Sequence, residues 1–348
     1  MNELDYFCKD LKKNFIPKIR DPKKPVNFWS EKEIFNDRIV NSFVIILRTK
    51  GCSWSAKSGC SMCGYFNDSY QKDVSSKDLL IQFEKAMEKY NGEEIVKIFN
   101  SGSFFDDNEI KAKARIKILD KLSKKTKKIS VESRPEYINQ LKLNEIGNIL
   151  DKIEFEIGIG LETADDYIRK NSINKGFDLI DYQNATAIMK KNGIKTKTYL
   201  LLKPPFLTEK EAIDDTIKSI MKINKTTDLI SINPTNIHKN TYVEYLWKRN
   251  LYSPIWLWSI IDVLIKSKKI IGEKRIKSDI VAGGSIRGPH NCGKCDKKIV
   301  DNISKFSLNQ NIELLKESSC ECYDKWLDQI EIEKYLFGVQ INKNRKMI

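Results

Sequence analysis

Short β-branched runs alternate with amphipathic segments through most of this chain, and the alternation limits the folds available to it. The first run, at 43–47, is continuous and apolar, as in a strand buried on both faces. Further strands are predicted at 95–99, 128–132, 153–159, 196–202 and 229–232, and helices at 77–90, 107–123, 137–150, 179–191, 209–223 and 255–266. Strands that alternate with helices indicate βαβ units and a parallel sheet, so we expect an α/β protein.

Three cysteines lie on one loop directly after the first predicted strand. Cys52, Cys60 and Cys63 are spaced C-x7-C-x2-C in a stretch rich in Gly, Ser and Lys. Three thiolates leave one iron of a cubic iron–sulfur cluster open to a substrate or cofactor, whereas a structural zinc or a fully ligated cluster needs four. We therefore predict an open cluster. The alternatives are inert buried thiols, or part of a zinc site completed from elsewhere in the chain.

A second cysteine set lies near the C-terminus. A C-x2-C knuckle and a C-x-C pair, separated by 24 residues, supply Cys292, Cys295, Cys320 and Cys322. Four thiolates suit a closed tetrahedral zinc site, which we predict here. A second iron–sulfur cluster is the competing interpretation, and His290 is an alternative ligand. Such a site would pin the C-terminal segment onto the rest of the protein.

The stretch RTKGCSWSAKSGCSMCGYFND at 48–68 resembles the cluster loop of radical S-adenosylmethionine (SAM) enzymes. It is most similar to the radical-SAM component of archaeosine synthase, a group related to the catalytic subunit of elongator. The resemblance extends from about residue 40 to the last cysteines. It implies a partial (β/α)6 radical-SAM barrel with chemistry on the loops after the strands. We expect an N-terminal arm at 1–40, the barrel at 41–285 and a small Cys-rich zinc module at 286–348.

The resemblance also implies roles for the loop residues. Cys52, Cys60 and Cys63 would hold a 4Fe–4S cluster whose fourth iron binds SAM. The turn after the second strand would bind the methionine amino group of SAM, Glu132 its ammonium or ribose, Glu162 its ribose, and Arg134 or Arg169 its carboxylate. The cofactor-binding candidates are Met62, Ser101, Gly102, Ser103, Glu132, Arg134, Glu162, Arg169, Lys203 and Asn233. The alternatives are ordinary turns and a Glu–Arg pair that closes a loop; His238 receives no role.

The function implied by this resemblance is tRNA modification. In the archaeosine group, a partner subunit attaches lysine to a 7-deazaguanine in the tRNA D loop. The radical-SAM component then cleaves the C–N bond and leaves the amidine, which requires an electron donor. Other hypotheses are a radical-SAM enzyme for another tRNA position or a small molecule, and a zinc-stabilised RNA-binding module without catalysis.

Charge and hydropathy agree with a polyanionic partner. The formal net charge is +14, which favours phosphate contacts, although heavy use of Lys, Asn and Ile throughout is an alternative explanation. Basic clusters occur at 124–128, 268–275 and 343–346. No apolar run is long enough to span a membrane, and the first residues lack a signal-peptide core. Cysteines in close sets suggest metal ligands in a reducing compartment, so we expect a cytoplasmic protein.

Overall fold

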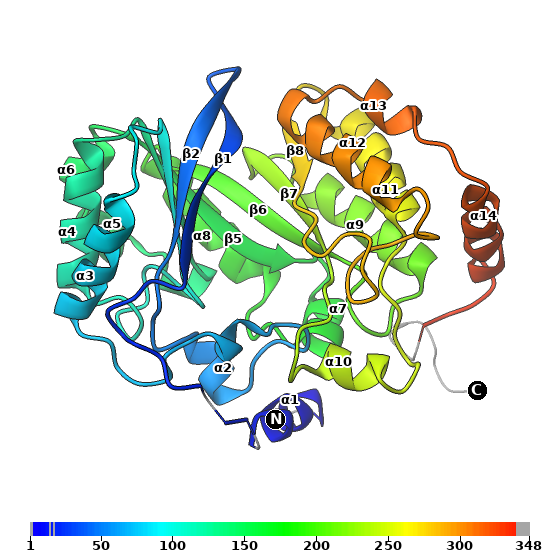
Figure 1. Ribbon diagram of the computed structural model, residues 1–348, viewed down its shortest axis with the longest axis horizontal. Helices are drawn as coiled ribbons and strands as arrows, with labels where there is room; N and C mark the ends of the chain where they lie inside the picture. The colour runs from blue at the N-terminus through cyan, green and yellow to red at the C-terminus, as the bar shows by residue number, and fades with distance from the viewer. Residues whose placement is uncertain (1–2, 14, 17, 339–348) are drawn as a thin grey trace.

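The computed structural model describes residues 3–13, 15–16 and 18–338, and one curled sheet forms the centre of this part of the chain (Figure 1). Its strands follow the order β1-β2-β3-β4-β5-β6-β7-β8. They are β1 (Asn27–Phe35), β2 (Arg38–Ile46), β3 (Ile95–Phe99), β4 (Lys128–Glu132), β5 (Glu154–Glu162), β6 (Lys195–Leu202), β7 (Leu229–Pro234) and β8 (Arg275–Ser278). Strands β2 to β8 pair in parallel, whereas β1 is antiparallel to β2. The predicted partial (β/α)6 barrel is confirmed in β2–β7, with one further strand at each edge.

Helices cover the convex face of this sheet, where the strands present apolar side chains. The covering helices are α3 (Ser76–Met87), α4 (Ala112–Ser123), α8 (Leu179–Lys191), α9 (Glu209–Ile223) and α11 (Leu257–Ile271). Ile98 and Val131, adjacent in register, are fully buried in the same core cluster as Phe83 of α3. Capping defines the start of α9: the Thr208 hydroxyl accepts from the backbone N–H of Glu211, and the backbone N–H of Thr208 donates to the Glu211 carboxylate. Burial of this apolar face is the main stabilising term for such a sheet.

Two predicted helices differ from the structure. The segment predicted as one helix at 137–150 is broken into α5 (Gln140–Asn144) and α6 (Gly147–Leu150) after a 3-10 turn, Pro135–Tyr137. Gly147 lies at the break, and glycine weakens a helix interior. The helix predicted from residue 107 begins only at Ala112, because the preceding residues form the turn that carries part of the site.

The N-terminal segment contributes to the sheet. It forms α1 (Glu3–Lys13) and then β1, which turns into β2 through Asn36 and Asp37. Both turn residues have positive φ, 49° and 56°. Two consecutive residues of that conformation define the tight turn whose twist suits a hairpin. The domain boundaries given above stay a prediction.

The concave face of the sheet is charged rather than apolar. Lys97 of β3 forms an ion pair with Glu33 of β1 at 2.6 Å, and Lys128 of β4 one with Glu156 of β5 at 2.8 Å. These side chains are buried, and buried charges persist where they are paired.

The two edge strands are joined by side chains across the open side of the sheet. Arg275 of β8 donates to the carbonyl of Ile34 at 3.0 Å and pairs with Glu33 at 3.2 Å. Lys277 lies 3.4 Å from the same carboxylate. Ion pairs therefore bridge the gap between β1 and β8 near the amino ends of the parallel strands.

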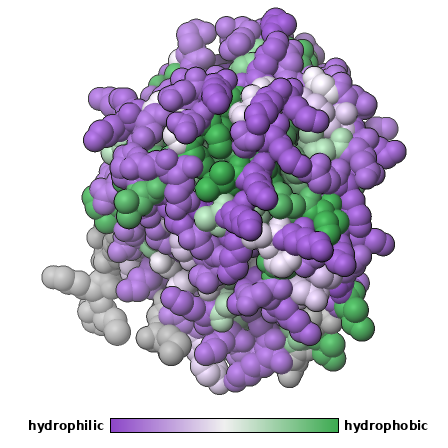
Figure 2. Space-filling model, turned by 90° about the vertical axis from the view of Figure 1, so that its left-hand side faces the viewer, coloured by the Kyte–Doolittle hydropathy of each residue, from purple (hydrophilic) through white to green (hydrophobic). Residues whose placement is uncertain are grey.

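The remaining helices lie at the ends of the barrel. The short elements α2 (Ser53–Lys57), the 3-10 turn Tyr65–Asn67, α7 (Asp166–Ile168), the π-turn Arg169–Ile173 and α10 (Tyr242–Trp247) lie at its mouth, at the bottom of Figure 1, beside α1. The C-terminal helices α12 (Asp296–Asn309), α13 (Glu313–Lys316) and α14 (Cys322–Glu333) pack beyond β8, α11 and α9. The face in Figure 2 is mostly hydrophilic. No helix in the described part is long and apolar enough to cross a membrane. The basic cluster at 343–346 lies outside the described residues.

Candidate functional site

The three-cysteine loop connects β2 to α3 at the mouth of the barrel. Cys52 precedes α2, and the N–H of Cys63 donates to the carbonyl of Cys60 at 3.3 Å. Burial raises the pKa of Cys52 to about 11, and the nearby carboxylate of Glu109 raises it further. Burial and the charge of Cys60 raise the pKa of Cys63 to about 12. Thiolates that are costly to form next to one another suit a site where a cationic iron centre compensates their charge.

Two remote side chains fix the first half of this loop. Lys12 of α1 donates to the carbonyl of Ser58 at 2.7 Å, and Asn174 donates to the carbonyl of Gly59 at 2.9 Å. A Cβ on Gly59 would collide with the Lys12 ammonium, and this residue has a φ of +95°. Only glycine adopts that conformation readily, so the spacer between Cys52 and Cys60 needs it.

His238, for which no role was predicted, positions the second half of the loop. Its Nδ1 accepts the N–H of Gly64 at 3.1 Å, directly after Cys63. A Cβ on Gly64 would lie 2.4 Å from the His238 Cβ, so the close approach requires glycine. Burial lowers the pKa of His238, which keeps the imidazole neutral and able to accept. His238 is therefore a positioning residue for the cysteine loop.

The turn after β3 surrounds a buried carboxylate that sequence reasoning missed. Glu109 accepts from the N–H of Ser103 at 2.7 Å, from the Asn100 amide at 2.9 Å and from the Thr49 hydroxyl at 3.3 Å. A Cβ on Gly102 would overlap this carboxylate. Burial raises the pKa of Glu109 to about 7. The predicted residues Ser101, Gly102 and Ser103 thus form a turn around Glu109, six residues beyond Ser103.

Arg134, after β4, is buried at this turn with an unfilled donor. Its backbone N–H donates to Ser103 Oγ at 3.0 Å, and its Nε donates to Glu136 at 2.5 Å. The guanidinium lies over the rings of Trp54 and Phe177, 5.6 and 5.2 Å from their centroids. Its Nη2 is buried without a hydrogen-bond partner among the described residues. Burial alone would lower the pKa of Arg134, but Glu136 and the cysteine thiolates raise it, so the group stays cationic.

The bulge that ends β5 places another charge pair at the mouth. Glu162 has a φ of +68°, a costly conformation for a residue with a side chain. Its carboxylate pairs with Lys175 at 2.6 Å. A Cβ on Gly160 would lie 2.8 Å from both the carboxylate and the ammonium, so glycine makes room for the pair. The charge of Cys60 also acts on Lys175, which places the pair near the thiols.

Two further groups face the same opening. Burial raises the pKa of Glu132, at the end of β4. Tyr65 follows the last cysteine, and 62% of its surface is exposed. Burial of its hydroxyl raises its pKa, and so do Cys63, Glu132 and Glu162. The hydroxyl of Tyr65 therefore lies close to these three groups, although much of its ring is exposed. The sequence signal was its place two residues after Cys63.

Other predicted contacts have protein partners. Arg169 donates to the carbonyls of Leu161, at 3.3 Å, and Thr163, and pairs with Asp166. It therefore braces the turn after β5. A role for Arg169 in binding the SAM carboxylate stays a prediction that this bracing does not support.

The last three predicted SAM contacts also have neighbours within the protein. Lys203 forms a buried ion pair with Glu209 at 2.7 Å. Asn233 accepts from the Ser231 hydroxyl at 3.2 Å, on the concave face. Met62 packs on the apolar side of α10. Their roles as SAM contacts also stay predictions.

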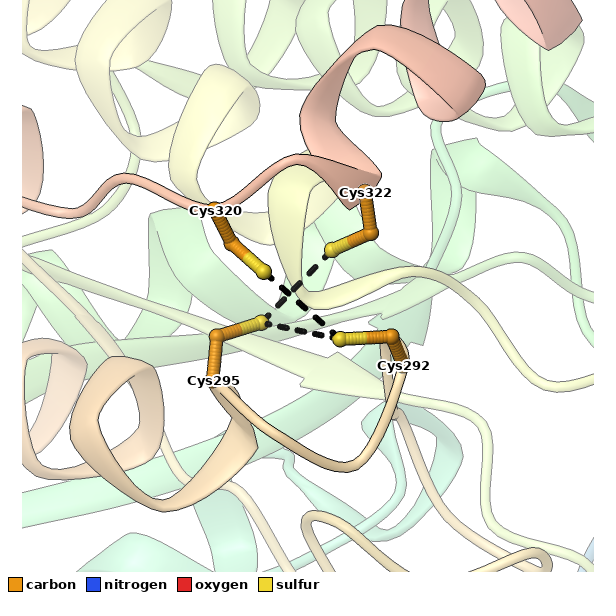
Figure 3. Close-up of side chains that lie close together, drawn as sticks. All are labelled: Cys292, Cys295, Cys320 and Cys322. Atoms are coloured by element: carbon orange, nitrogen blue, oxygen red, sulfur yellow. Dashed lines mark hydrogen bonds between the residues drawn. The ribbon is translucent and has the colours of Figure 1, made fainter.

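The four C-terminal cysteines converge on one point (Figure 3). Their sulfurs lie within 4.8 Å of one another, with Cys292 3.9 Å from Cys295 and 3.6 Å from Cys320, and Cys295 3.7 Å from Cys322. Zinc–sulfur bonds of about 2.3 Å in a tetrahedron place sulfurs about 3.8 Å apart. The set fits a single ion. It is too tight for a four-iron cluster, in which an iron stands behind each thiolate. His290 Nδ1 lies 2.8 Å from the carbonyl of Gly288, so that nitrogen already has a partner.

A curled parallel sheet carries a three-cysteine loop at its mouth, which is the class of architecture expected from the resemblance to radical SAM enzymes. No family model matches it. It is 41% identical to archaeosine synthase subunit beta of Methanosarcina acetivorans, over 91% of this chain and 93% of the relative. It is 38% identical to the protein of that name from Thermococcus kodakarensis, over 86% and 95%. The chain belongs to the archaeosine synthase subunit beta family.

Two further comparisons complete these findings. An uncharacterised protein of Methanocaldococcus jannaschii is 40% identical over 98% of this chain and 97% of its own. Among solved structures, Elp3 of Methanocaldococcus infernus superposes with a TM-score of 0.46 at 16% identity, covering 67% of this chain and 58% of that one.

Proposed function

We propose that this protein is a radical SAM C–N lyase of archaeosine biosynthesis. Its substrate would be tRNA with lysine attached to a 7-deazaguanine in the D loop, and its product the amidine. The names of the two archaeosine synthase relatives support this assignment. The observation that carries the radical part is the fixed three-thiol loop beside a buried arginine with an unfilled donor.

The residues at the mouth fit the cofactors that this reaction needs. Cys52, Cys60 and Cys63 would hold a 4Fe–4S cluster. Arg134 Nη2 and Asn100 Oδ1 are both buried without a hydrogen-bond partner among the described residues, one a donor and the other an acceptor. They match the carboxylate and the ammonium at the methionine end of SAM. When bound, the cluster and SAM supply a 5′-deoxyadenosyl radical that abstracts hydrogen beside the bond to be broken.

The other residues at the mouth orient and shield these groups. The Glu109 turn shapes the wall next to Cys52, and the Glu162–Lys175 pair closes the opposite side beside Cys60. The rings of Trp54 and Phe177 both lie against the Arg134 guanidinium and would shield it from water. Fixed charges in a dry site orient a ligand without reorganisation.

At the C-terminal cysteines we propose a structural zinc. The sulfur spacing supports one tetrahedral ion, and four thiolates without an open position suit zinc. The indole N–H of Trp258 lies 3.3 Å from Cys322 Sγ, a second layer that orients the thiolate.

The protein would act in the cytoplasm with three partners. These are tRNA, the lysine-transferring subunit of archaeosine synthase and an electron donor. The word "subunit" in the names of the relatives supports a complex.

The decisive experiment is an anaerobic assay of the reduced protein on tRNA that carries the lysine adduct, with and without the partner subunit. We expect 5′-deoxyadenosine together with loss of the lysine carbon chain from the tRNA by mass spectrometry. Cleavage of SAM without change in the tRNA would indicate another radical SAM reaction. A colourless protein that holds only zinc would indicate a non-catalytic module.

Cys60→Ala tests the ligand assignment. The variant should lose most of the iron of the barrel site and at least about 100-fold of SAM cleavage, since an incomplete set of thiolates does not hold the cluster. Cys8→Ala is the matched control, because Cys8 is also a buried thiol whose charge acts on the same region. Equal iron content and SAM cleavage in both variants would contradict the assignment.

A further inference from the structure

Lys197 of β6 is a buried ammonium without a protein partner. Only 4% of its surface is exposed. The three other buried lysines of the concave face, Lys97, Lys128 and Lys277, each pair with a carboxylate. Lys197 Nζ makes no hydrogen bond or ion pair within the described residues, and its nearest charge-stabilising group is the ring of Tyr199, 4.5 Å from the ring centroid. Burial and the nearby Lys277 lower the pKa of Lys197. An ammonium kept buried without an acceptor costs stability, which is unusual away from a binding site.

Asp279, directly after β8, is the acid with the largest favourable effect on the charge of Lys197. Its carboxylate accepts from Ser231 at 3.3 Å and pairs with Lys277 at 3.0 Å, yet 48% of its side chain is accessible. Burial alone would raise the pKa of Asp279, but Lys277 and Lys197 lower it, so the acid is ionised. The charges of Asp279 and Lys197 act on each other, so a cation and an anion lie near one another on this side of the sheet.

Other charged side chains also act on Lys197. On the charge of Lys197, Lys277 of β8 and Lys97 of β3 act unfavourably, and Glu156 of β5 favourably. Glu33 pairs with Lys97 and Lys277, and Glu156 pairs with Lys128. The charge of Lys197 also acts on Glu132, but the two form no ion pair among the described residues.

A series of neighbouring side chains connects Lys197 to the cysteine loop. Tyr199 is the next residue along β6 on the same face, toward the carboxyl end. A Cβ on Gly158 would meet both Tyr199 and Glu132, so these two side chains lie together above Lys197. Tyr199 and Glu132 are only partly buried, and Glu132 acts on Tyr65 beside Cys63. Tyr199, Glu132 and Tyr65 therefore connect Lys197 to the cluster loop on this face of the sheet.

We propose that Lys197 and Asp279 bind the amino-acid end of the substrate, Lys197 its α-carboxylate and Asp279 its α-ammonium. The identity of that substrate as a lysine adduct rests on the proposed function. In such an adduct the side-chain nitrogen is bonded to the base, so the α-carboxylate and α-ammonium are its free charged groups. Binding them at the floor of the barrel would place the carbon beside the C–N bond toward the cluster.

The physical argument is complementarity of charge. A carboxylate at Lys197 Nζ supplies the missing hydrogen-bond acceptor and offsets the burial of the ammonium. An ammonium at Asp279 would form a second ion pair with this carboxylate, on the side that Lys277 does not occupy. A ligand with only one of the two charges would leave the other group unmatched, which gives the site its specificity.

The test is calorimetric titration of the SAM-loaded anaerobic holoenzyme with three probes that need neither tRNA nor radical chemistry. Nε-Acetyl-L-lysine carries both charges, 6-acetamidohexanoate only the carboxylate, and N-acetylcadaverine only the ammonium. We expect the wild type to bind Nε-acetyl-L-lysine at least about tenfold tighter than either of the other two, as charged hydrogen bonds predict.

Variants assign each charge to its residue. Lys197→Met should bind Nε-acetyl-L-lysine no tighter than N-acetylcadaverine, and Asp279→Asn no tighter than 6-acetamidohexanoate. Both should fold, since Lys197 has no partner to lose and Lys277 keeps Glu33. Lys195→Met is the matched control: Lys195 lies on the same strand, but its side chain is 51% exposed and pairs with Asp228. This variant should behave as the wild type.

Equal binding of the three probes to the wild type, no binding of any, or an unchanged carboxylate preference in Lys197→Met would overturn the inference. The proposed function fails separately: if the probes bind as expected but the tRNA adduct is not cleaved, the amino-acid site stands and the tRNA reaction does not.

Discussion

Asp215 of α9 is a buried carboxyl group with one satisfied oxygen. Its Oδ1 accepts from the Thr163 hydroxyl at 2.8 Å, and its Oδ2 is buried without a partner among the described residues. Burial and the nearby Asp165 raise the pKa of Asp215 to about 7. The folded protein therefore binds a proton here at pH values where the unfolded chain does not. Stability from this group is complete below the unfolded pKa near 4 and is lost as pH rises through 7.

Asp215→Asn should remove this dependence. Because one pKa unit corresponds to about 1.4 kcal/mol, the variant should be more stable than the wild type by on the order of 2–4 kcal/mol at pH 8. The difference should shrink toward pH 4, where both carry a neutral side chain. Denaturant unfolding of both proteins between pH 4 and 8 measures it. A constant difference across that range would contradict the assigned titration.

At the level of single residues, the candidate metal ligands could be predicted from the sequence, whereas the residues that position them could not. The spacing of Cys52, Cys60 and Cys63 identified the loop, because several thiols within a few residues are rare without a metal. Glu109 and His238 were missed, since a single acid or histidine carries no pattern and its role depends on contacts such as that of Gly64 with a residue 174 positions away. Long-range contacts of this kind are not encoded in local spacing.

At the scale of elements, the strands with apolar faces were predicted and the charged edge strands were not. β1 carries Glu31 and Glu33 on the face that turns toward the interior of the sheet. The four-residue β8 carries Arg275 and Lys277. These charges hide the alternation that marks a strand, because the interior that they face is itself charged. The Asn36-Asp37 turn was the one local signal of the hairpin.

Glu33→Gln tests the side-chain bridge between β1 and β8. The change leaves Lys97, Lys277 and Arg275 without their common carboxylate, and removing one partner of a buried ion pair costs about 3–5 kcal/mol. Neighbouring acids can relieve part of this, so a loss of about 2–4 kcal/mol in unfolding free energy is expected. Glu31→Gln is the control, since Glu31 is 37% exposed and should lose under about 1 kcal/mol. Equal losses would show that the bridge does not matter.

Cys295→Ser tests the C-terminal metal site. Metal analysis should find about one zinc fewer per chain and unchanged iron, because the two sites use separate thiols. α14 should then be cleaved faster in limited proteolysis, since Cys322 and the Trp326–Ser259 hydrogen bond, 2.8 Å long, hold it to α11. Loss of iron in place of zinc would overturn the zinc assignment.

For the molecule as a whole, the formal net charge is +14, and its basic residues serve two different purposes. Of the predicted basic clusters, Lys128 and Arg275 turn inward to carboxylates, whereas Lys124, Lys125 and Lys127 are exposed on the surface. A count along the sequence cannot separate these two uses of a basic residue. Lys124 and Lys127 pair with the surface acids Asp120 and Glu94, and a phosphate would compete with these exposed carboxylates.

Binding of tRNA should therefore depend steeply on salt. With about six phosphate contacts, affinity should fall at least about 100-fold between 50 and 200 mM salt. SAM cleavage without tRNA serves as the control and should change little. Filter binding at several salt concentrations measures the slope, and a fall of less than about threefold would exclude a mainly electrostatic interface.

The loop that carries the three thiols is tied to positions 46, 115 and 174 residues away. Such ties exist only once the entire barrel has assembled. The cluster would thus be inserted into a folded apoprotein, which should keep its structure without iron. After oxygen destroys the cluster, reconstitution with iron and sulfide should restore the protein without new synthesis.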